Sequence, residues 1–368
     1  MEYIVLILKN TLKLLHKAEK RIKSLVSKAF DGGSVGFRRR ENYIVDPMTW
    51  GEQEEVASME NARLRKSFRT VLVLSVNAGL LLPMGCQPDL PQMDAEVHRS
   101  EIEAWQIRRI EGLKAPTGWL SVIGLDWLEP GENTFGADST HAVVFPSLPG
   151  VPDRAGSFFL EEGVVRMEVE PGVQVTHEGE PVTSLEIFGT EGIRPATVQL
   201  ASLQWQVIQR QDLIGIRLRD TANAAIEAFE GIEMFPVSLD WRIPARFERY
   251  DPPRTIEVPN VLGQISPQPS PGAVVFRVGG ERLRLDVTGN PEGRSFSVVF
   301  GDETNGLESY GGGRFLTVDA PDAEGRLYID FNRAYNPPCV FTAYATCPLP
   351  PPQNKLPVRI EAGEMGGH

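Results

Sequence analysis

From Thr117 to the end of the chain, almost every patterned segment is short and alternates apolar with polar residues. Alternation with period two indicates strands that are buried on one face, and turn pairs such as Glu-Gly, Pro-Gly and Gly-Asn separate the segments. No long helical period lies between them, which argues against a doubly wound α/β sheet. The sequence therefore predicts an all-β fold of mainly antiparallel sandwich or barrel units. The predicted strands are VVRMEVE, TVQL, LQWQVIQR, IGIRLRD, RTIEVP, AVVFRV, RLRLDV, SFSVVF, RFLTV and RLYIDF.

One helix is expected ahead of the strands, over residues 94–116. Its apolar residues recur at three- to five-residue steps, with charges on the other faces, and they are Ile102, Trp105, Ile110 and Leu113. Asp94 is a suitable N-cap, and Pro116 ends the helix because the residue before a proline leaves helical geometry. Residues 86–93, rich in proline and polar side chains, have the composition of a tether.

The alternating region is expected to divide at residues 222–244, a connecting segment without alternation. This division gives a first β unit at 117–221 and a second at 245–368. In the first unit, LEPGENTFGADSTHAVVFP followed by AGSFFLEEGVVRMEVEPGVQVTHEGEPV resembles a forkhead-associated-like sandwich, a fold often used to bind phosphothreonine. Ala137 stands where that family has an arginine, so the resemblance implies the fold alone.

A secretory signal is predicted at residues 59–85. The segment opens with basic residues and continues as an apolar run at 71–82, which is shorter than the roughly 20 residues of a membrane-spanning helix. Leu-Pro-Met-Gly before Cys86 resembles a bacterial lipobox, so Cys86 is the expected lipidation site; an ordinary signal peptide or an uncleaved anchor is the alternative. Residues 1–58 are then interpreted as an upstream extension from a misassigned start codon, with a cytoplasmic basic amphipathic helix as the alternative.

The charge of the chain argues against nucleic acid as a partner. Beyond residue 85 the sequence has 23 basic and 40 acidic residues, a net charge of −17, and such a surface repels phosphate backbones. Together with the anchor, this predicts a cell-envelope protein that faces the periplasm or the exterior. Its expected contacts are the membrane, through the lipid, and an unidentified small-molecule or envelope partner.

Five sequence blocks, spread from about Asp94 to Glu364, carry a resemblance to a known family. They are WQIRRIEGLKAPTGWLSVIGLDWLEPGENTFG, GIRLRD, FPVSLDWRIPARF, FGDETNGLESYGGGRFL and DFNRAYNPPCVFTAYATCPLPPPQNKLPVRIEAGE. Together they resemble a bacterial family known as domain of unknown function 1684 (DUF1684), and the last block is the most specific. The resemblance implies membership of that family and brings no established activity.

Serine-triad chemistry is not expected. The histidines beyond the signal lie in the predicted helix, in predicted turns and on the last residue, and no G-x-S-x-G elbow occurs. These residues are His98, His141, His177 and His368. No cofactor is expected.

Cys339 and Cys347 lie in the proline-rich run DFNRAYNPPCVFTAYATCPLPPPQN. In an oxidising compartment, two cysteines with seven residues between them are expected to form a disulfide that closes a small loop. A zinc or other metal site with an outside ligand, or a pair of reduced packing cysteines, are the alternatives. Two cysteines are too few for a closed zinc site, so no metal is assigned.

A polar cluster around the end of RLYIDF supplies the candidate catalytic residues, which are Asp330, Asn332, Arg333, Tyr335, Asn336 and Arg314. Asp330 and Asn332 share a face by alternation. Arg314, with Asp302 and Thr304 nearby, would bind a carboxylate or phosphate while Asp330 acts as a base.

The same residues also suit a structural latch that satisfies buried backbone groups. On this interpretation residues 311–313 only allow a turn with positive φ. Glu361 and Glu364 fit either arrangement. In GIRLRD, Arg217 and Asp220 cannot share a face, so one of them should point inward.

Two function classes remain after the sequence is examined. The leading prediction is an anchored binding or structural module, and the alternative is a hydrolase built around Asp330 and Arg314. A cleft that gathers Asp330, Arg333, Tyr335 and Arg314 favours the enzyme, whereas burial of these groups in paired hydrogen bonds favours the module.

Overall fold

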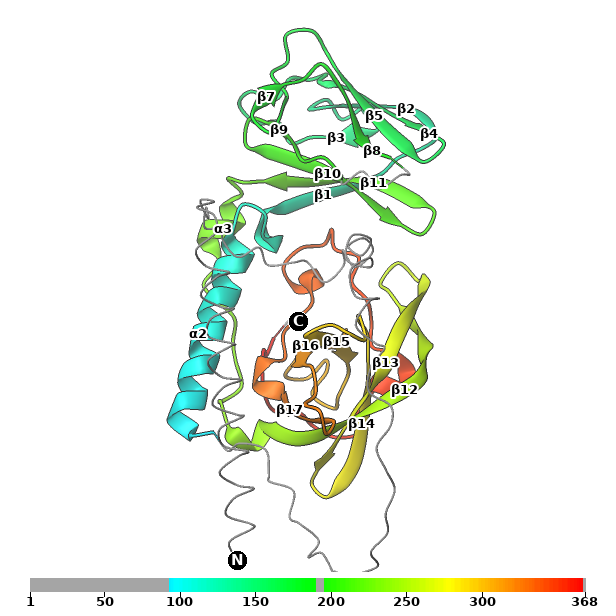
Figure 1. Cartoon of the computed structure of the whole chain (residues 1–368). Coiled ribbons are helices and arrows are strands. Elements are labelled where there is room, and N and C mark those ends of the chain that lie inside the picture. The colour runs from blue at the N-terminus through cyan, green and yellow to red at the C-terminus, as the bar shows by residue number, and fades with distance from the viewer. Residues whose placement is uncertain (1–92, 190–194, 367–368) are drawn as a thin grey trace, which may run out of the picture. The chain divides into compact units, whose positions relative to one another are not determined.

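The short alternating segments form strands in the computed structural model, which describes residues 93–189 and 195–366. The fold is mostly β with one long helix near the start of the described chain, as the sequence predicts (Figure 1). The predicted upstream extension, signal segment, lipidation site Cys86 and most of the tether lie outside the described residues, and so does His368. The described residues all belong to one compact unit, 47–368.

The long helix is α2 (Ala95–Lys114), and it begins and ends where the sequence predicts. Asp94 is its N-cap and accepts hydrogen bonds from the backbone N–H groups of Glu96 and Val97 at 2.9 and 3.2 Å. Its buried face carries His98, Ile102 and Leu113. In the described chain, no helix is long and apolar enough to cross a membrane.

The first β unit is a sandwich of two sheets. One sheet has the order β1-β11-β10-β9-β6-β7 and the other β3-β2-β4-β5-β8; among their described strands, only β2 and β3 pair in parallel. The strands of the first sheet are β1 (Val122–Trp127), β11 (Leu213–Asp220), β10 (Leu203–Arg210), β9 (Val198–Leu200), β6 (Thr176–His177) and β7 (Glu180–Pro181). Those of the second are β3 (Val143–Val144), β2 (Gly131–Gly136), β4 (Gly156–Glu161), β5 (Val164–Val169) and β8 (Ser184–Phe188).

An aromatic cluster fills the space between these two sheets. Trp205 on β10 packs against Phe135, Phe145 and Phe158, with ring centroids 5.1 to 6.5 Å apart. All four rings are buried. Burial of rings from both sheets explains why the alternating sequence folds as a sandwich, since each sheet has one apolar face to cover.

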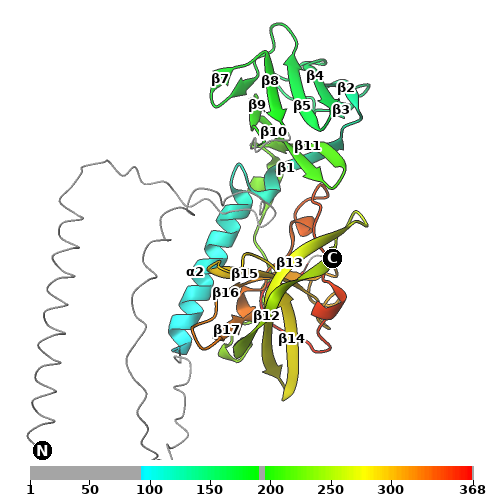
Figure 2. The ribbon, with the colours of Figure 1, turned by 45° about the vertical axis from the view of Figure 1, so that its right-hand side comes forward.

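The second β unit combines a four-stranded sheet, β14-β13-β12-β17, with the hairpin β15-β16. Among the described strands of this unit, every pairing is antiparallel. Figure 2 shows the long β12–β13 hairpin in green and yellow. The strands are β12 (Arg242–Pro259), β13 (Ile265–Val278), β14 (Glu281–Val287), β15 (Ser295–Phe300), β16 (Arg314–Asp319) and β17 (Arg326–Asp330).

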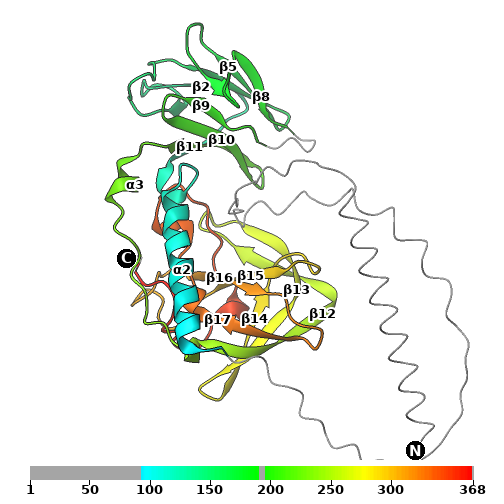
Figure 3. The same cartoon turned by 60° about the vertical axis from the view of Figure 1, so that its left-hand side comes forward.

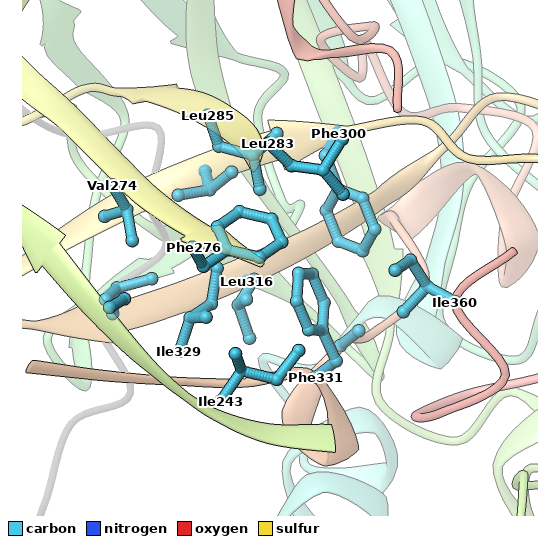
Figure 4. Packing of buried hydrophobic residues seen from close by; sticks show 14 of the residues in the cluster. Ile243, Val274, Phe276, Leu283, Leu285, Phe300, Leu316, Ile329, Phe331 and Ile360 are labelled. Atoms are coloured by element: carbon cyan, nitrogen blue, oxygen red, sulfur yellow. The ribbon is translucent and has the colours of Figure 1, made fainter. Parts of the chain in front are cut away.

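One hydrophobic core joins all six of these strands (Figure 4). Phe331 lies at its centre, with ring centroids 5.4 Å from both Phe276 and Phe300. Ile360 and Ala362, from the C-terminal segment, are fully buried in the same core. The segment after β17 is therefore part of the unit's interior, although it forms no strand.

Short helices fill the connections between these elements. They are η1 (Trp119–Ser121), α3 (Ala224–Ala228), η2 (Leu239–Trp241), η3 (Phe331–Arg333), η4 (Pro338–Val340) and η5 (Pro352–Asn354).

Strand β12 is longer than the sequence predicts. It starts at Arg242, inside the stretch expected to lack strand structure, and it runs through Tyr-Asp-Pro-Pro. The register with β13 shifts between Arg249 and Arg254, so the intervening residues form a bulge. The two prolines cannot donate ladder hydrogen bonds, which is why the sequence resembles a turn there and why the strand continues only around a bulge.

Candidate functional site

Arg314 lies at the first residue of β16 and is 0% exposed. Its Nη2 donates to Asp302 Oδ2 at 2.7 Å and to the carbonyl of Ile360 at 2.8 Å, and its Nη1 donates to the carbonyl of Ala362. Burial lowers the pKa of Arg314, an effect that the nearby Asp302 carboxylate opposes. The guanidinium is thus committed to its own chain, as the latch interpretation predicts.

The glycine run before Arg314 is required for close packing. Gly313 has φ +85°, and a Cβ there would lie 2.3 Å from Pro350 Cγ and 2.6 Å from the carbonyl oxygen of Phe300. No side chain fits this position, so at Gly313 the glycine run allows a positive φ and close contact with the proline-rich segment.

Asp330 ends β17 and is held by a helix from far away in the sequence. Its Oδ2 lies 2.8 Å from Nε2 of His98 on α2, and its Oδ1 accepts hydrogen bonds from the backbone N–H and side-chain amide of Asn332 at 3.1 and 2.8 Å. Asn332 also donates to the carbonyl of Ser238 at 2.8 Å. Figure 3 shows α2 in front of β16 and β17.

A second set of contacts links α2 to the C-terminal segment. Arg109 Nε donates to Glu364 Oε1 at 3.0 Å, and its Nη2 donates to the carbonyl of Asn336 at 2.9 Å. Glu364 Oε2 accepts from the backbone N–H of Asn336 at 2.7 Å. The Arg109 guanidinium also lies over the rings of Tyr335 and Phe341, 4.9 and 5.3 Å from their centroids.

Glu364 is fully buried, and desolvation raises its pKa although Arg109 opposes this shift. A carboxylate with a raised pKa in a cleft suggests a catalytic acid. Here it is surrounded by Arg109, Asn336 and Arg314, and it bonds to two of them. The shift therefore results from burial inside a structural network.

The remaining candidates stand at the edge of this network. Arg333 pairs with Glu101 of α2 at 3.5 Å, and both side chains are partly exposed. Glu361 pairs with Arg359 at 3.0 Å, also at the surface. Among the described hydrogen bonds and ion pairs, none joins Arg314 to Asp330. The structure thus places the two groups in separate hydrogen-bond networks.

Cys339 and Cys347 are free cysteines in the structure, so the predicted disulfide is not formed there. The backbone N–H of Cys339 points at Cys347 Sγ at 3.1 Å. Backbone hydrogen bonds at Pro337 and Pro338 already close the turn, and Cys347 packs with Phe315 and Ala345. The loop is therefore held without the bridge. Within the described residues, no group of three or more His, Cys, Asp or Glu residues could hold a metal ion.

Of the pair in GIRLRD, Arg217 is the residue that points inward. It is 2% exposed, whereas Asp220 is half-buried. Its guanidinium carbon lies 5.0 Å from the ring centroid of Trp119.

Three residues that lie in these networks or close to the β12 bulge were not predicted as site residues from the sequence. His98 and Arg109 lie on the face of α2 that also carries Ile102, so their helical spacing was a usable signal. Tyr250, beside the β12 bulge, donates to Asp286 Oδ1 at 2.6 Å, and Arg254 lies 4.0 Å from its ring centroid. No sequence signal for Tyr250 existed, because the bulge that orients it resembles a turn.

Three solved structures show distant similarity to this chain. An uncharacterised protein from Haloarcula marismortui, solved by NMR, is 29% identical over 38% of this chain and 78% of its own, with a TM-score of 0.32. A forkhead-associated domain studied for phosphothreonine-dependent interactions is 16% identical over 26% of this chain and 92% of its own, with a TM-score of 0.18. Rad53 is 10% identical over 43% of this chain and 35% of its own, with a TM-score of 0.14.

A search of curated protein sequences finds no match. The family comparison is more informative, because it matches residues 227–365, which extend from α3 through the second β unit to the C-terminal segment. This stretch contains both Arg314 and Asp330, whereas α2 lies outside it. The region 227–365 matches the family described as "Protein of unknown function (DUF1684)".

Proposed function

We propose that the chain is an envelope lipoprotein, anchored through Cys86, whose β body is a binding or structural module. The observation that carries the module proposal is that the two central catalytic candidates, Arg314 and Asp330, already bond within the chain. Arg314 is 0% exposed and bonds to Asp302 and to backbone carbonyls, while Asp330 bonds to His98 and Asn332. A hydrolase needs a base and a cation that reach a substrate. These two groups instead reach other parts of the chain, which argues against the alternative hydrolase centred on them.

The surface best suited to a partner is formed by two hairpin tips. Leu213 starts β11, and Val261, Leu262 and Ile265 lie at the β12–β13 turn; all four are exposed, between 39 and 54%. The tips are linked by a hydrogen bond from the Gln211 side chain to the Ile265 carbonyl at 2.7 Å. A group of exposed apolar side chains on ordered hairpins is typical of an interaction surface.

The anchor is tested by replacing Cys86 with serine in the full chain. Wild-type protein should incorporate a labelled fatty acid and fractionate with membranes, and C86S should lose both properties. Equal fractionation and labelling of the two proteins would exclude Cys86 as the lipid attachment site.

The hairpin surface is tested by placing a photo-crosslinking residue at position 262 in cells, with position 178 as the control. Leu262 lies on the proposed surface, whereas Glu178 is a polar residue in the β6–β7 turn. A discrete crosslinked species from position 262 alone supports the binding module. The same pattern from both positions, or none from position 262, contradicts the proposed surface.

A further inference from the structure

The two cysteines differ in exposure in a way that packing alone does not require. Cys347 is 1% exposed, in a small cluster with Phe315 and Ala345. Cys339 is half-buried and lies within η4, at the edge of that cluster. A part-exposed cysteine beside a buried one is the arrangement of a nucleophilic thiol and a resolving thiol.

The loop geometry brings the sulfur of Cys347 against the backbone of Cys339. The backbone N–H of Cys339 donates to Cys347 Sγ at 3.1 Å, and the Cys339 thiol lies 3.8 Å from the carbonyl oxygen of Ala345, to which it donates. The neighbouring Cys347 side chain, as the main cause, lowers the pKa of Cys339 to about 7. The pKa of Cys347 is raised, chiefly by the neighbouring Cys339 side chain and by burial.

Two further groups stabilise the thiolate of Cys347 once it forms. The backbone N–H of Cys339 already points at it, and the buried guanidinium of Arg217 on β11 lowers its pKa through charge. Burial and the charge of both sulfurs raise the pKa of the Tyr310 phenol.

We infer that Cys339 and Cys347 form a thiol–disulfide exchange site that takes a small disulfide as its co-reactant. The Cys339 thiolate attacks one sulfur of that disulfide, whose S–S bond breaks and releases one thiolate. Cys347 then loses its proton and attacks Cys339 in the mixed disulfide, and the second thiolate leaves. The protein is oxidised by two electrons, the co-reactant is reduced to two thiols, and the protons of the protein pass to those thiols.

The location of the pair gives this chemistry a structural consequence. The loop between the cysteines carries Thr342 and Thr346, which bond to the first β unit: Thr342 donates to the carbonyl of Val122 at 2.9 Å, and Arg210 donates to Thr346 at 2.7 Å. Oxidation and reduction therefore act on a loop that connects the second β unit to the first. This inference does not depend on the proposed anchor or on the hairpin surface.

The test uses the full chain with Cys86 replaced by serine, so that only two thiols remain. Glutathione disulfide is added to the reduced, folded protein, the reaction is stopped with acid, and intact masses are followed with time. The expected end point is a loss of about 2 Da, one intramolecular disulfide, without retained glutathione. In C347S the reaction should stop with glutathione on residue 339, and C339S should react at least tenfold more slowly.

Arg217 is tested as a positioning residue. In R217M the mixed disulfide should accumulate, because Cys347 ionises less readily, while alkylation of Cys339 keeps its wild-type rate; R217K should restore fast resolution. A merely structural role would change both steps together.

Three outcomes would overturn the inference. In the first, both thiols react only after denaturation. In the second, C347S retains no glutathione on Cys339. In the third, a metal ion copurifies with the protein and protects the pair.

Discussion

Replacing Arg109 with alanine should weaken the attachment of α2 to the second β unit by about 3 kcal/mol at pH 7. The substitution removes the Nε hydrogen bond to Glu364 at 3.0 Å, the Nη2 bond to the Asn336 carbonyl, and the stacking on Tyr335 and Phe341. Glu364 is 0% exposed and keeps only the backbone N–H of Asn336 as a donor. An uncompensated buried charge is the main cost.

Protonation sets the upper limit of that cost. Glu364 can take up a proton instead of staying charged, and this costs about 1.4 kcal/mol for each pH unit between the ordinary glutamate pKa of about 4.3 and the assay pH. At pH 7 the electrostatic loss therefore cannot exceed about 3.7 kcal/mol. The lost stacking on Tyr335 and Phe341 adds roughly 1 kcal/mol. The protonation cost itself lies below the upper limit, because burial already raises the pKa of Glu364 in the wild-type protein.

The sign of the pH dependence follows from the raised pKa of Glu364. A carboxyl whose pKa is higher in the folded state favours folding at low pH and loses that contribution as the pH rises through the folded pKa. Removing Arg109 raises this pKa further. The difference between R109A and the wild type should therefore be largest at neutral pH and shrink as the pH approaches about 4.3, where Glu364 is increasingly protonated in both proteins.

Native-state hydrogen exchange of the α2 and β17 amides measures this free energy without requiring the whole chain to unfold in one step. Arg108, the exposed neighbour on the same helix, supplies the matched control, and R108A should change stability by less than about 0.5 kcal/mol. If R109A and R108A gave equal losses, or if the loss in R109A did not vary with pH, the buried pair would not be what holds the helix.

Three further substitutions test the second β unit. R314M should destabilise it by about 3 to 5 kcal/mol in urea titrations because Asp302 is left buried without its partner, whereas R359M at the surface should leave the urea midpoint nearly unchanged. G313A should lower the thermal midpoint more than G263A, because both have φ near +80° but only Gly313 has atoms within 4 Å of the added methyl group. Y250F should cost about 1 to 3 kcal/mol by leaving Asp286 without its phenol donor, and Y344F at an exposed tyrosine should be neutral in the same titration.

The strands were predictable because a sheet with one buried face requires apolar residues at every second position of each strand. SFSVVF became β15, with buried and part-buried residues alternating along it, and RLYIDF became β17 followed by Phe331 at the centre of the core. Helix α2 was predictable from its N-cap at Asp94 and the proline at its end. These features depend on neighbours within a few residues.

The site was harder to predict because its contacts join distant parts of the chain. Asp330 and His98 are 232 residues apart, and Arg109 and Glu364 are 255 apart, so no local sequence spacing predicts either pair. A buried arginine that serves a latch and an arginine that binds a ligand have the same sequence signature. Only the observed burial of Arg314 separates the two interpretations.

The proline-rich C-terminal segment explains why this domain needs a buried arginine. Proline has no N–H, so a run rich in proline cannot join a sheet ladder, and the carbonyls of the chain around it must find donors elsewhere. Arg314 donates to the carbonyls of Ile360 and Ala362, and the side-chain amide of Asn354 donates to the carbonyls of Asp286 and Val299. Side chains thus replace the missing ladder. The arginine that resembles a catalytic cation in the sequence is the donor that lets a strandless segment complete the core.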